Sequence, residues 1–295
     1  MNIGLLNLEA KYKNFALEKL RLYHHIKGDC VQDYFALNKY DKVYVSSIFS
    51  STKKTIVPEN AICGGTGFDV ASKLPPDVES IKPHLNFGFT TRGCIRKCSF
   101  CIVPAKEGYI RKEGDLLDLW DGVARDIVLF DNNILALPSH FALVCEQAKA
   151  NRLRLDFNQG LDHRLLTPEI IGLMKSILHI EYRFAFDHPS YLDSVDKAIT
   201  LLQSRGINRC LWYVLVAFDT TFQQDLERLN YLRGRGQTAY VQVYNNRNTS
   251  LYSALSRWVN QHHLFKAMTW EQFLEHPDSH RRHIKSLVSG VGNSD

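Results

Sequence analysis

Long apolar segments are missing from this sequence of 295 residues. The longest, from Leu211 to Phe218, has eight residues, whereas a membrane-spanning helix needs about 20. The first ten residues include Glu9 and have no apolar core, so they do not resemble a signal peptide. We therefore expect a cytoplasmic protein that does not act at a membrane.

Charge of one sign is also scarce, because 36 Lys and Arg against 31 Asp and Glu leave a net charge of only +5. This surplus permits an anionic partner, but nucleic acid is possible rather than indicated. Hydrophobic residues make up 45% of the chain and charged residues 23%. That composition excludes a disordered chain, a collagen-like repeat and a coiled coil.

The seven cysteines are too few for a disulfide framework. Thiols stay reduced in the cytoplasm, and those that cluster are available as metal ligands. Three of the seven lie within eight residues of one another, and the other four are scattered. The clustered ones are Cys94, Cys98 and Cys101.

From residue 85 onward, short apolar runs alternate with helical patterns. The runs begin 42, 26, 29, 29 and 28 residues apart, which is about the length of one strand, one helix and two loops. Such alternation predicts parallel strands, but a full eight-unit barrel would need about 250 residues. We therefore expect an α/β fold with a partial (βα)6 TIM-like barrel. Its strands are predicted at residues 85–91, 127–130, 153–157, 182–186, 211–217 and 239–244.

A small N-terminal α/β unit is predicted for residues 1–80, with strands at 2–7 and 42–46 and a helix near 15–27. The barrel then occupies residues 81–250. A C-terminal helical extension and a frayed tail follow at residues 251–295. Its helices, at residues 251–265 and 270–274, are expected to cover the open edge of the barrel.

Several helix starts can be predicted from capping residues. Thr167 followed by Pro168 is typical of a helix N-terminus. Ser190 and Thr220 each precede an acidic or amide residue by three positions, which is the spacing of a capping box.

Cys94, Cys98 and Cys101 have the spacing C-x3-C-x2-C, directly after the first predicted strand. Three thiolates so close together can hold zinc, copper(I) or an iron–sulfur cluster. A structural zinc site uses four protein ligands, and no fourth cysteine or histidine lies nearby. Three ligands leave an open position, as a catalytic centre does. The alternatives are a structural zinc loop and chance proximity.

The segment from Arg92 to Lys112 contains six basic residues and Glu107 as its only acidic one. Positive charge helps to hold an anionic thiolate cluster and tunes its potential. A solvated loop, or a docking patch for an acidic electron donor, explains the same charges equally well.

With Phe100 before its last cysteine, the motif resembles the signature of the radical S-adenosylmethionine (radical SAM) superfamily, and the resemblance covers roughly residues 85–244. It implies a partial six-unit barrel and one 4Fe-4S cluster held by Cys94, Cys98 and Cys101, with SAM on the fourth iron. It also implies reductive cleavage of SAM to a 5′-deoxyadenosyl radical that abstracts hydrogen from a substrate. The electron would come from a donor such as a flavodoxin or ferredoxin, and neither the substrate nor a catalytic residue is assigned.

In this superfamily, residues at the ends of later strands contact SAM. Asp131 and Asn132 stand where many members have a Gly-Gly-Glu-like motif, from which this sequence departs. They are candidates for the SAM amino group, or else form a turn after a buried strand. Arg183 is suited to the SAM carboxylate, because guanidinium groups pair with carboxylates through two hydrogen bonds. The predicted cofactor-binding residues are Phe100, Asp131, Asn132, Asn158, Gln159, Arg183 and Tyr244.

Residues 1–80 resemble a shortened cobalamin-binding domain, but the chain lacks the Asp-x-His-x-x-Gly motif that binds cobalt, which disfavours cobalamin. Residues 1–80 contain only Cys30 and Cys63, which disfavours the second cluster of a methylthiotransferase. Two alternatives stay open: a non-catalytic metal-binding (zinc or iron–sulfur) or nucleic-acid-binding module, and a degenerate barrel that keeps its cluster without cleaving SAM.

Overall fold

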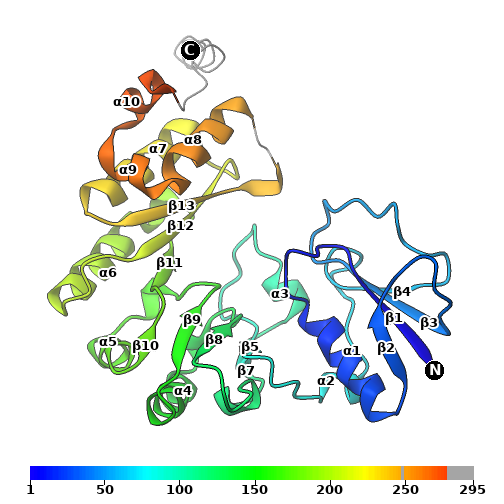
Figure 1. Cartoon of the computed structure of the whole chain (residues 1–295). Helices are drawn as coiled ribbons and strands as arrows, with labels where there is room; N and C mark the ends of the chain where they lie inside the picture. The colour runs from blue at the N-terminus through cyan, green and yellow to red at the C-terminus, as the bar shows by residue number, and fades with distance from the viewer. Residues whose placement is uncertain (247–248, 278–295) are drawn as a thin grey trace. The chain divides into compact units, whose positions relative to one another are not determined.

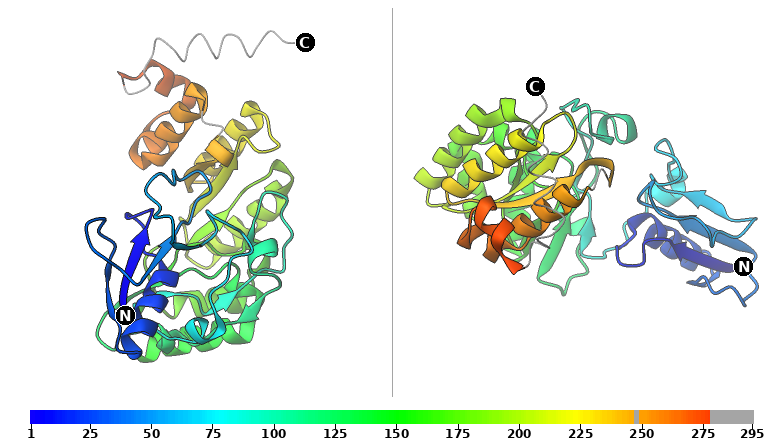
Figure 2. Two further views of the ribbon diagram at one scale, coloured as in Figure 1. Left: turned by 90° about the vertical axis from the view of Figure 1, so that its right-hand side faces the viewer. Right: turned by 90° about the horizontal axis from the view of Figure 1, so that it is seen from above.

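The computed structural model describes residues 1–246 and 249–277. They form a mixed α/β structure whose sheets are mainly parallel, in two compact units that divide after Asn132. Figures 1 and 2 show the strands of each unit flanked by helices. None of the helices in these residues is long and apolar enough to span a bilayer. The three predicted domains stay a prediction, and the predicted frayed tail lies outside the described residues.

The N-terminal part of the first unit is a parallel sheet in the order β2-β1-β3-β4. Its predicted strands at residues 2–7 and 42–46 are confirmed, and the predicted helix ends one residue early. Ile3 and Leu5 on β1 are buried against Leu17 and Leu20 of α1, which forms a small core. The elements are β1 (Asn2–Asn7), α1 (Phe15–Ile26), β2 (Cys30–Asp33), β3 (Lys42–Ser46), β4 (Ile62–Gly64) and α2 (Pro76–Glu79).

The first predicted barrel strand is much shorter than expected. Only β5 (Phe87–Gly88) pairs with β8 (Asp126–Leu129), in parallel. Gly88 has φ +153°, and a Cβ there would lie 2.7 Å from Leu119 Cδ2, so a glycine suits this position. The rest of the unit consists of β6 (Thr91–Arg92), α3 (Val103–Lys106), β7 (Arg111–Lys112) and a short 3₁₀ helix, η1 (Leu116–Asp118).

The second unit repeats strand and helix in the predicted order. β9 pairs in parallel with β10, and β11, β12 and β13 form a parallel sheet in that order. The predicted strand at residues 182–186 is shortened to β11, and β10, which precedes it, was not predicted. The strands are β9 (Arg154–Phe157), β10 (Leu178–His179), β11 (Arg183–Ala185), β12 (Leu211–Val216) and β13 (Thr238–Val243). The helices are η2 (Ile134–Ala136), α4 (Pro138–Ala150), η3 (His163–Leu165), α5 (Pro168–Lys175), η4 (Pro189–Tyr191), α6 (Leu192–Ser204), α7 (Phe222–Gly234), η5 (Tyr244–Asn246), α8 (Ser250–Asn260), α9 (His262–Ala267) and α10 (Trp270–Glu275).

The two faces of the β11–β12–β13 sheet differ in polarity. Phe184, Trp212 and Val214 are fully buried on one face. Tyr213 and Tyr240, one position away from this set, lie opposite each other in register with ring centroids 6.1 Å apart. Alternation along a strand therefore gives the sheet one apolar face and one that carries polar side chains.

Helix α8 covers the outer edge of this sheet. Asn260 Oδ1 accepts the Val241 N–H at 2.7 Å, and Asn260 Nδ2 donates to the Val241 carbonyl at 3.2 Å. One side chain thus satisfies both backbone groups that the edge strand β13 exposes at this position. That the C-terminal helices cover the open edge of a partial barrel stays a prediction.

Of the helix starts predicted from capping residues, one is confirmed, one lies a residue later and one is wrong. Thr167 caps α5 as expected, through Ile170 N–H. The capping box of α7 uses Thr221, one residue later than predicted, because the Thr220 hydroxyl bonds Asp225 at 2.6 Å instead. The predicted box at Ser190 is wrong, because that residue lies within η4 and α6 begins at Leu192 without a side-chain cap.

Candidate functional site

The three clustered cysteines lie in a hairpin loop of the first unit, residues 93–110. Strands β6 and β7 form its antiparallel stem, and the Cys94 N–H donates to the Gly108 carbonyl at 3.2 Å where the loop opens. Gly93 has φ +84°, and a Cβ there would lie 2.4 Å from the Tyr109 carbonyl oxygen. Only glycine fits this position, so the base of the loop is closely packed backbone.

Backbone N–H groups are directed at the sulfur atoms. The Arg96 N–H lies 3.3 Å from Cys94 Sγ, and the Val103 N–H lies 3.4 Å from Cys101 Sγ. The Cys101 N–H donates to the Cys98 carbonyl at 3.0 Å, which makes a tight turn between these two cysteines. All three thiols are partly buried, as is Phe100. Hydrogen bonds to sulfur favour thiolate ligands and tune the potential of an iron–sulfur cluster.

The cysteines are nevertheless not gathered as ligands. Among residues 1–246 and 249–277, no three His, Cys, Asp or Glu side chains form a group that could hold a metal ion. The donor set therefore has the chemistry that a soft metal centre needs, but not the arrangement in this structure.

Asp131 lies just beyond β8 and binds the segment that leads into the cysteine loop. Its Oδ1 accepts the Thr90 N–H at 3.1 Å and the Thr90 hydroxyl at 2.9 Å. The Thr91 N–H and hydroxyl bond the same oxygen, the hydroxyl at 2.5 Å. Asp131 is only 4% exposed, and burial raises the pKa of its carboxyl group although these hydrogen bonds lower it.

Asn132, the next residue, also holds the loop. Its Oδ1 accepts the Gly93 N–H at 3.0 Å. Asp131 and Asn132 thus meet the start of the cysteine loop, as their predicted place at the end of a neighbouring strand requires. The oxygens that we expected to accept from the SAM amino group bind this backbone instead, so their role towards SAM stays a prediction.

Arg92, at the end of β6, is surrounded by three carboxylates. Its guanidinium nitrogens lie 3.2 Å from Glu79 Oε1, 3.2 Å from Glu107 Oε1 and 3.4 Å from Glu113 Oε1. The guanidinium also lies 4.2 Å from the centre of the Phe89 ring. Arg92 therefore ties both ends of the hairpin to α2.

Other basic side chains of this segment are also engaged. Lys106 Nζ donates to the Ser72 carbonyl at 2.6 Å, and burial lowers the pKa of this ammonium group. Lys112 Nζ lies 2.7 Å from Asp115 Oδ1. Acidic residues on either side of the segment pair with its basic side chains. The segment therefore has less unpaired positive charge than its own sequence predicts.

In the second unit, two of the predicted residues share a polar cluster. Arg183 forms an ion pair with Asp156 of β9, and both side chains are largely buried. The Tyr213 hydroxyl donates to the Asn158 carbonyl at 2.9 Å. Gln159 is exposed beside them. The strand alternation that separates Arg183 from its buried apolar neighbours is as predicted.

Tyr244 lies beyond the end of β13 and is partly buried. Its ring packs edge-on against Phe218, with centroids 4.6 Å apart. It thus lies at the carboxyl end of its strand, as predicted.

Sequence reasoning missed a buried ion pair at the carboxyl ends of β11 and β12. Arg228 NH2 lies 2.5 Å from Asp225 Oδ1 and donates to the Leu215 carbonyl at 2.7 Å, while NH1 bonds the Phe186 carbonyl. A sequence signal existed, because Asp225 and Arg228 lie three residues apart on the same helical face as Leu229, which is buried.

Asp187 lies beside this ion pair. Its Oδ1 accepts the Leu215 N–H at 3.4 Å. Burial raises the pKa of its carboxyl group to about 6, although this hydrogen bond and the charges of Arg228 and Arg164 lower it. A carboxyl group that titrates near neutral pH can donate or accept a proton.

Chemically, the first unit thus offers three thiols on a braced loop. The second offers a paired guanidinium group and a carboxyl group with a raised pKa. Comparison of the sequence with models of known protein families and with curated proteins found no match to either.

Proposed function

We propose that this chain is a radical SAM enzyme that binds one 4Fe-4S cluster through Cys94, Cys98 and Cys101. The observation that carries the proposal is the place of the C-x3-C-x2-C motif. It follows β5 in a loop that the end of the parallel neighbour β8 holds through Asp131 and Asn132. The carboxyl ends of parallel strands are where barrel enzymes bind their substrates.

The loop's own residues support this role. Two backbone N–H groups already approach sulfur, and Gly93, Arg92 and Asn132 fix the stem from which the thiols extend. Assembly of the cluster then needs the three side chains to turn towards a common point within a short loop. When bound together with SAM, the cluster supplies the electron that cleaves SAM reductively.

We propose a partial (βα)6 barrel as the finer description of the fold. Parallel pairing within each unit and the alternation of strand and helix support it. In this arrangement, Asn158 and Gln159 follow β9 and Tyr244 follows β13, on the side where SAM would bind, whereas Arg183 is the first residue of β11. Arg183 would then exchange its partner Asp156 for the SAM carboxylate, or share its guanidinium between the two.

A flavodoxin or ferredoxin, both acidic one-electron donors, is the proposed electron source. Exposed basic side chains on the hairpin, such as Lys97 and Arg111, suit such a partner.

One observation favours a second candidate, a non-catalytic metal-binding module. The side-chain oxygens of Asp131 and Asn132 are engaged by the loop backbone, and the Gly-Gly-Glu-like motif is absent. A module that uses the cysteine loop only as a structural metal site needs no group for the SAM amine.

The two candidates differ in their metal. Protein purified and reconstituted without oxygen should contain about four iron and four acid-labile sulfide per chain and absorb in the visible range. Stoichiometric zinc with no sulfide would replace the first candidate with the second.

A further inference from the structure

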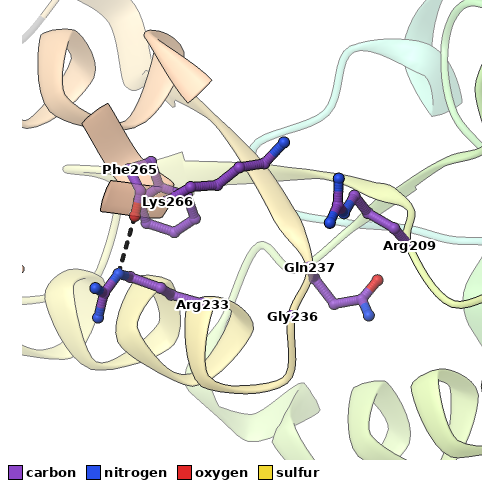
Figure 3. A pocket seen from close by; sticks show the side chains of 6 residues that line it. All are labelled: Arg209, Arg233, Gly236, Gln237, Phe265 and Lys266. Atoms are coloured by element: carbon purple, nitrogen blue, oxygen red, sulfur yellow. Dashed lines mark hydrogen bonds between the residues drawn. The ribbon is translucent and has the colours of Figure 1, made fainter. Parts of the chain in front are cut away.

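A basic cavity of about 330 Å³ lies in the second unit, away from the groups described above (Figure 3). A second cavity, of about 500 Å³, shares Arg209 with it, so the two adjoin at this residue and are together called the groove. The first is lined by Arg209, Arg233, Gly236, Gln237, Phe265 and Lys266.

The groove is strongly cationic. Lys175, Arg209, Arg233 and Lys266 line it, and Glu181 is its only acidic lining residue. Arg233 Nε donates to the Phe265 carbonyl at 2.9 Å, and Lys175 Nζ donates to the Arg205 carbonyl at 2.7 Å. Within the part of the chain that the structure describes, the side chains of Arg209 and Lys266 have no hydrogen bond or ion pair. Two exposed cations therefore border the first cavity, whose lining residues include no acidic one.

The groove lies at the amino ends of the strands. Lys175 ends α5, Arg209 comes two residues before β12, and Arg233 lies in the last turn of α7. Asp187 and the ion pair of Arg228 lie at the opposite, carboxyl ends. The groove is therefore not part of the site described above.

The loop that carries Arg209 is held in place by Gln237. Gln237 Oε1 accepts the Cys210 N–H at 3.0 Å and the Trp212 Nε1–H at 3.3 Å, while Nε2 donates to the Asn208 carbonyl at 3.0 Å. Gln237 is 5% exposed, so the backbone on both sides of Arg209 is anchored in the core. Because this backbone is already ordered, less conformational entropy is lost when a ligand binds to Arg209.

We propose that this groove binds the phosphodiester backbone of a single-stranded nucleic acid. In Figure 3, Arg209 and Lys266 approach the cavity from different elements, and Arg233 is directed towards Phe265. Cations spaced along a groove suit a chain of phosphates better than one compact anion, which needs converging donors. The exposed His179 ring stacks on the Tyr182 ring, with centroids 3.8 Å apart, and adds a flat surface for an unpaired base.

The test is fluorescence anisotropy of a labelled 12-nucleotide oligothymidylate with the full chain, at 50 to 200 mM salt. We expect binding whose log–log salt dependence has a slope of up to about −3, from four phosphate contacts. Arg209→Glu and Lys266→Glu should each weaken binding at least about tenfold at 50 mM salt and make the slope shallower. Lys197→Glu is the matched control, because Lys197 is an exposed cation on α6 outside the groove, and it should change binding less than about twofold.

Three results would overturn the proposal. One is no binding of the oligonucleotide at 50 mM salt. Another is equal weakening by Arg209→Glu and Lys197→Glu, which would reduce the effect to net charge. The third is complete displacement by tripolyphosphate at matched phosphate concentration, which would indicate a site for a small anion. Urea midpoints of the variants show that they are folded, and none of these measurements depends on the cysteine loop or on SAM.

Discussion

Asn132 Oδ1 accepts the backbone N–H of Gly93 at 3.0 Å, which joins the end of β8 to the residue that precedes Cys94. With Asp131 bound to Thr90 and Thr91, two consecutive residues brace the entrance of the cysteine loop. The position of the thiols therefore depends on a strand that lies some 30 residues further along the chain.

Replacing Asp131 should destabilise the first unit. Asp131→Ala removes a buried acceptor and leaves the N–H groups and hydroxyls of Thr90 and Thr91 without it. The cost should be about 3 kcal/mol of unfolding free energy, because unsatisfied buried donors are expensive. Urea unfolding measures it. Asp121→Ala is the control, since the exposed Asp121 also accepts two backbone N–H groups; equal losses in the two variants would refute the special role of Asp131.

Cys98→Ala should abolish cluster assembly, because two thiolates cannot replace three. Iron, sulfide and the visible spectrum after anaerobic reconstitution report the loss. Cys63→Ala, which removes an exposed thiol outside the motif, should leave all three unchanged. Unchanged iron in the Cys98 variant would remove this residue from the ligand set.

Arg183→Ala should weaken SAM binding about tenfold or more while iron content stays intact, because a charge-assisted pair with the SAM carboxylate is lost. Equilibrium dialysis with labelled SAM measures the affinity. Arg183→Ala also removes the ion pair with Asp156. SAM affinity is therefore measured in Asp156→Asn as well, because this variant loses the ion pair but keeps the Arg183 guanidinium group. Arg235→Ala, which breaks an ion pair with Asp196 elsewhere, is the matched control. Equal SAM affinity in wild type and Arg183→Ala would exclude the proposed contact.

Asp187 should make stability depend on pH. Burial raises the pKa of its carboxyl group from 3.8 to about 6, so the folded state binds the proton more tightly than the unfolded state does. The unfolding free energy should therefore fall as pH rises from about 4 to about 6, by up to about 3 kcal/mol. Asp187→Asn has no such charge and should reduce this dependence. Urea unfolding at pH 4.5 and pH 7 compares the two proteins, and parallel pH profiles would contradict the assignment.

The sequence predicted the order of strands and helices because apolar periodicity and turn residues are local signals. It failed where a backbone conformation depends on distant contacts. A Cβ at Gly88 would lie 2.7 Å from Leu119 Cδ2, and nothing near Gly88 in the sequence indicates this contact.

In the candidate site, too, local features could be predicted from the sequence and distant contacts could not. The spacing of the cysteines is local and could be recognised directly. The partners of Arg92 could not, because Glu79 and Glu113 lie outside the segment whose charges were counted. The raised pKa of the Asp187 carboxyl group could not be predicted either, since it depends on burial that the fold alone creates.

The most direct test of the proposed function is the formation of 5′-deoxyadenosine. Anaerobically reconstituted protein is mixed with SAM and a strong reductant, and the product is quantified by liquid chromatography beside the Cys98→Ala variant. The proposal predicts 5′-deoxyadenosine from the wild-type chain and none from the variant. Protein that contains iron and sulfide but forms no more 5′-deoxyadenosine than the variant would contradict it.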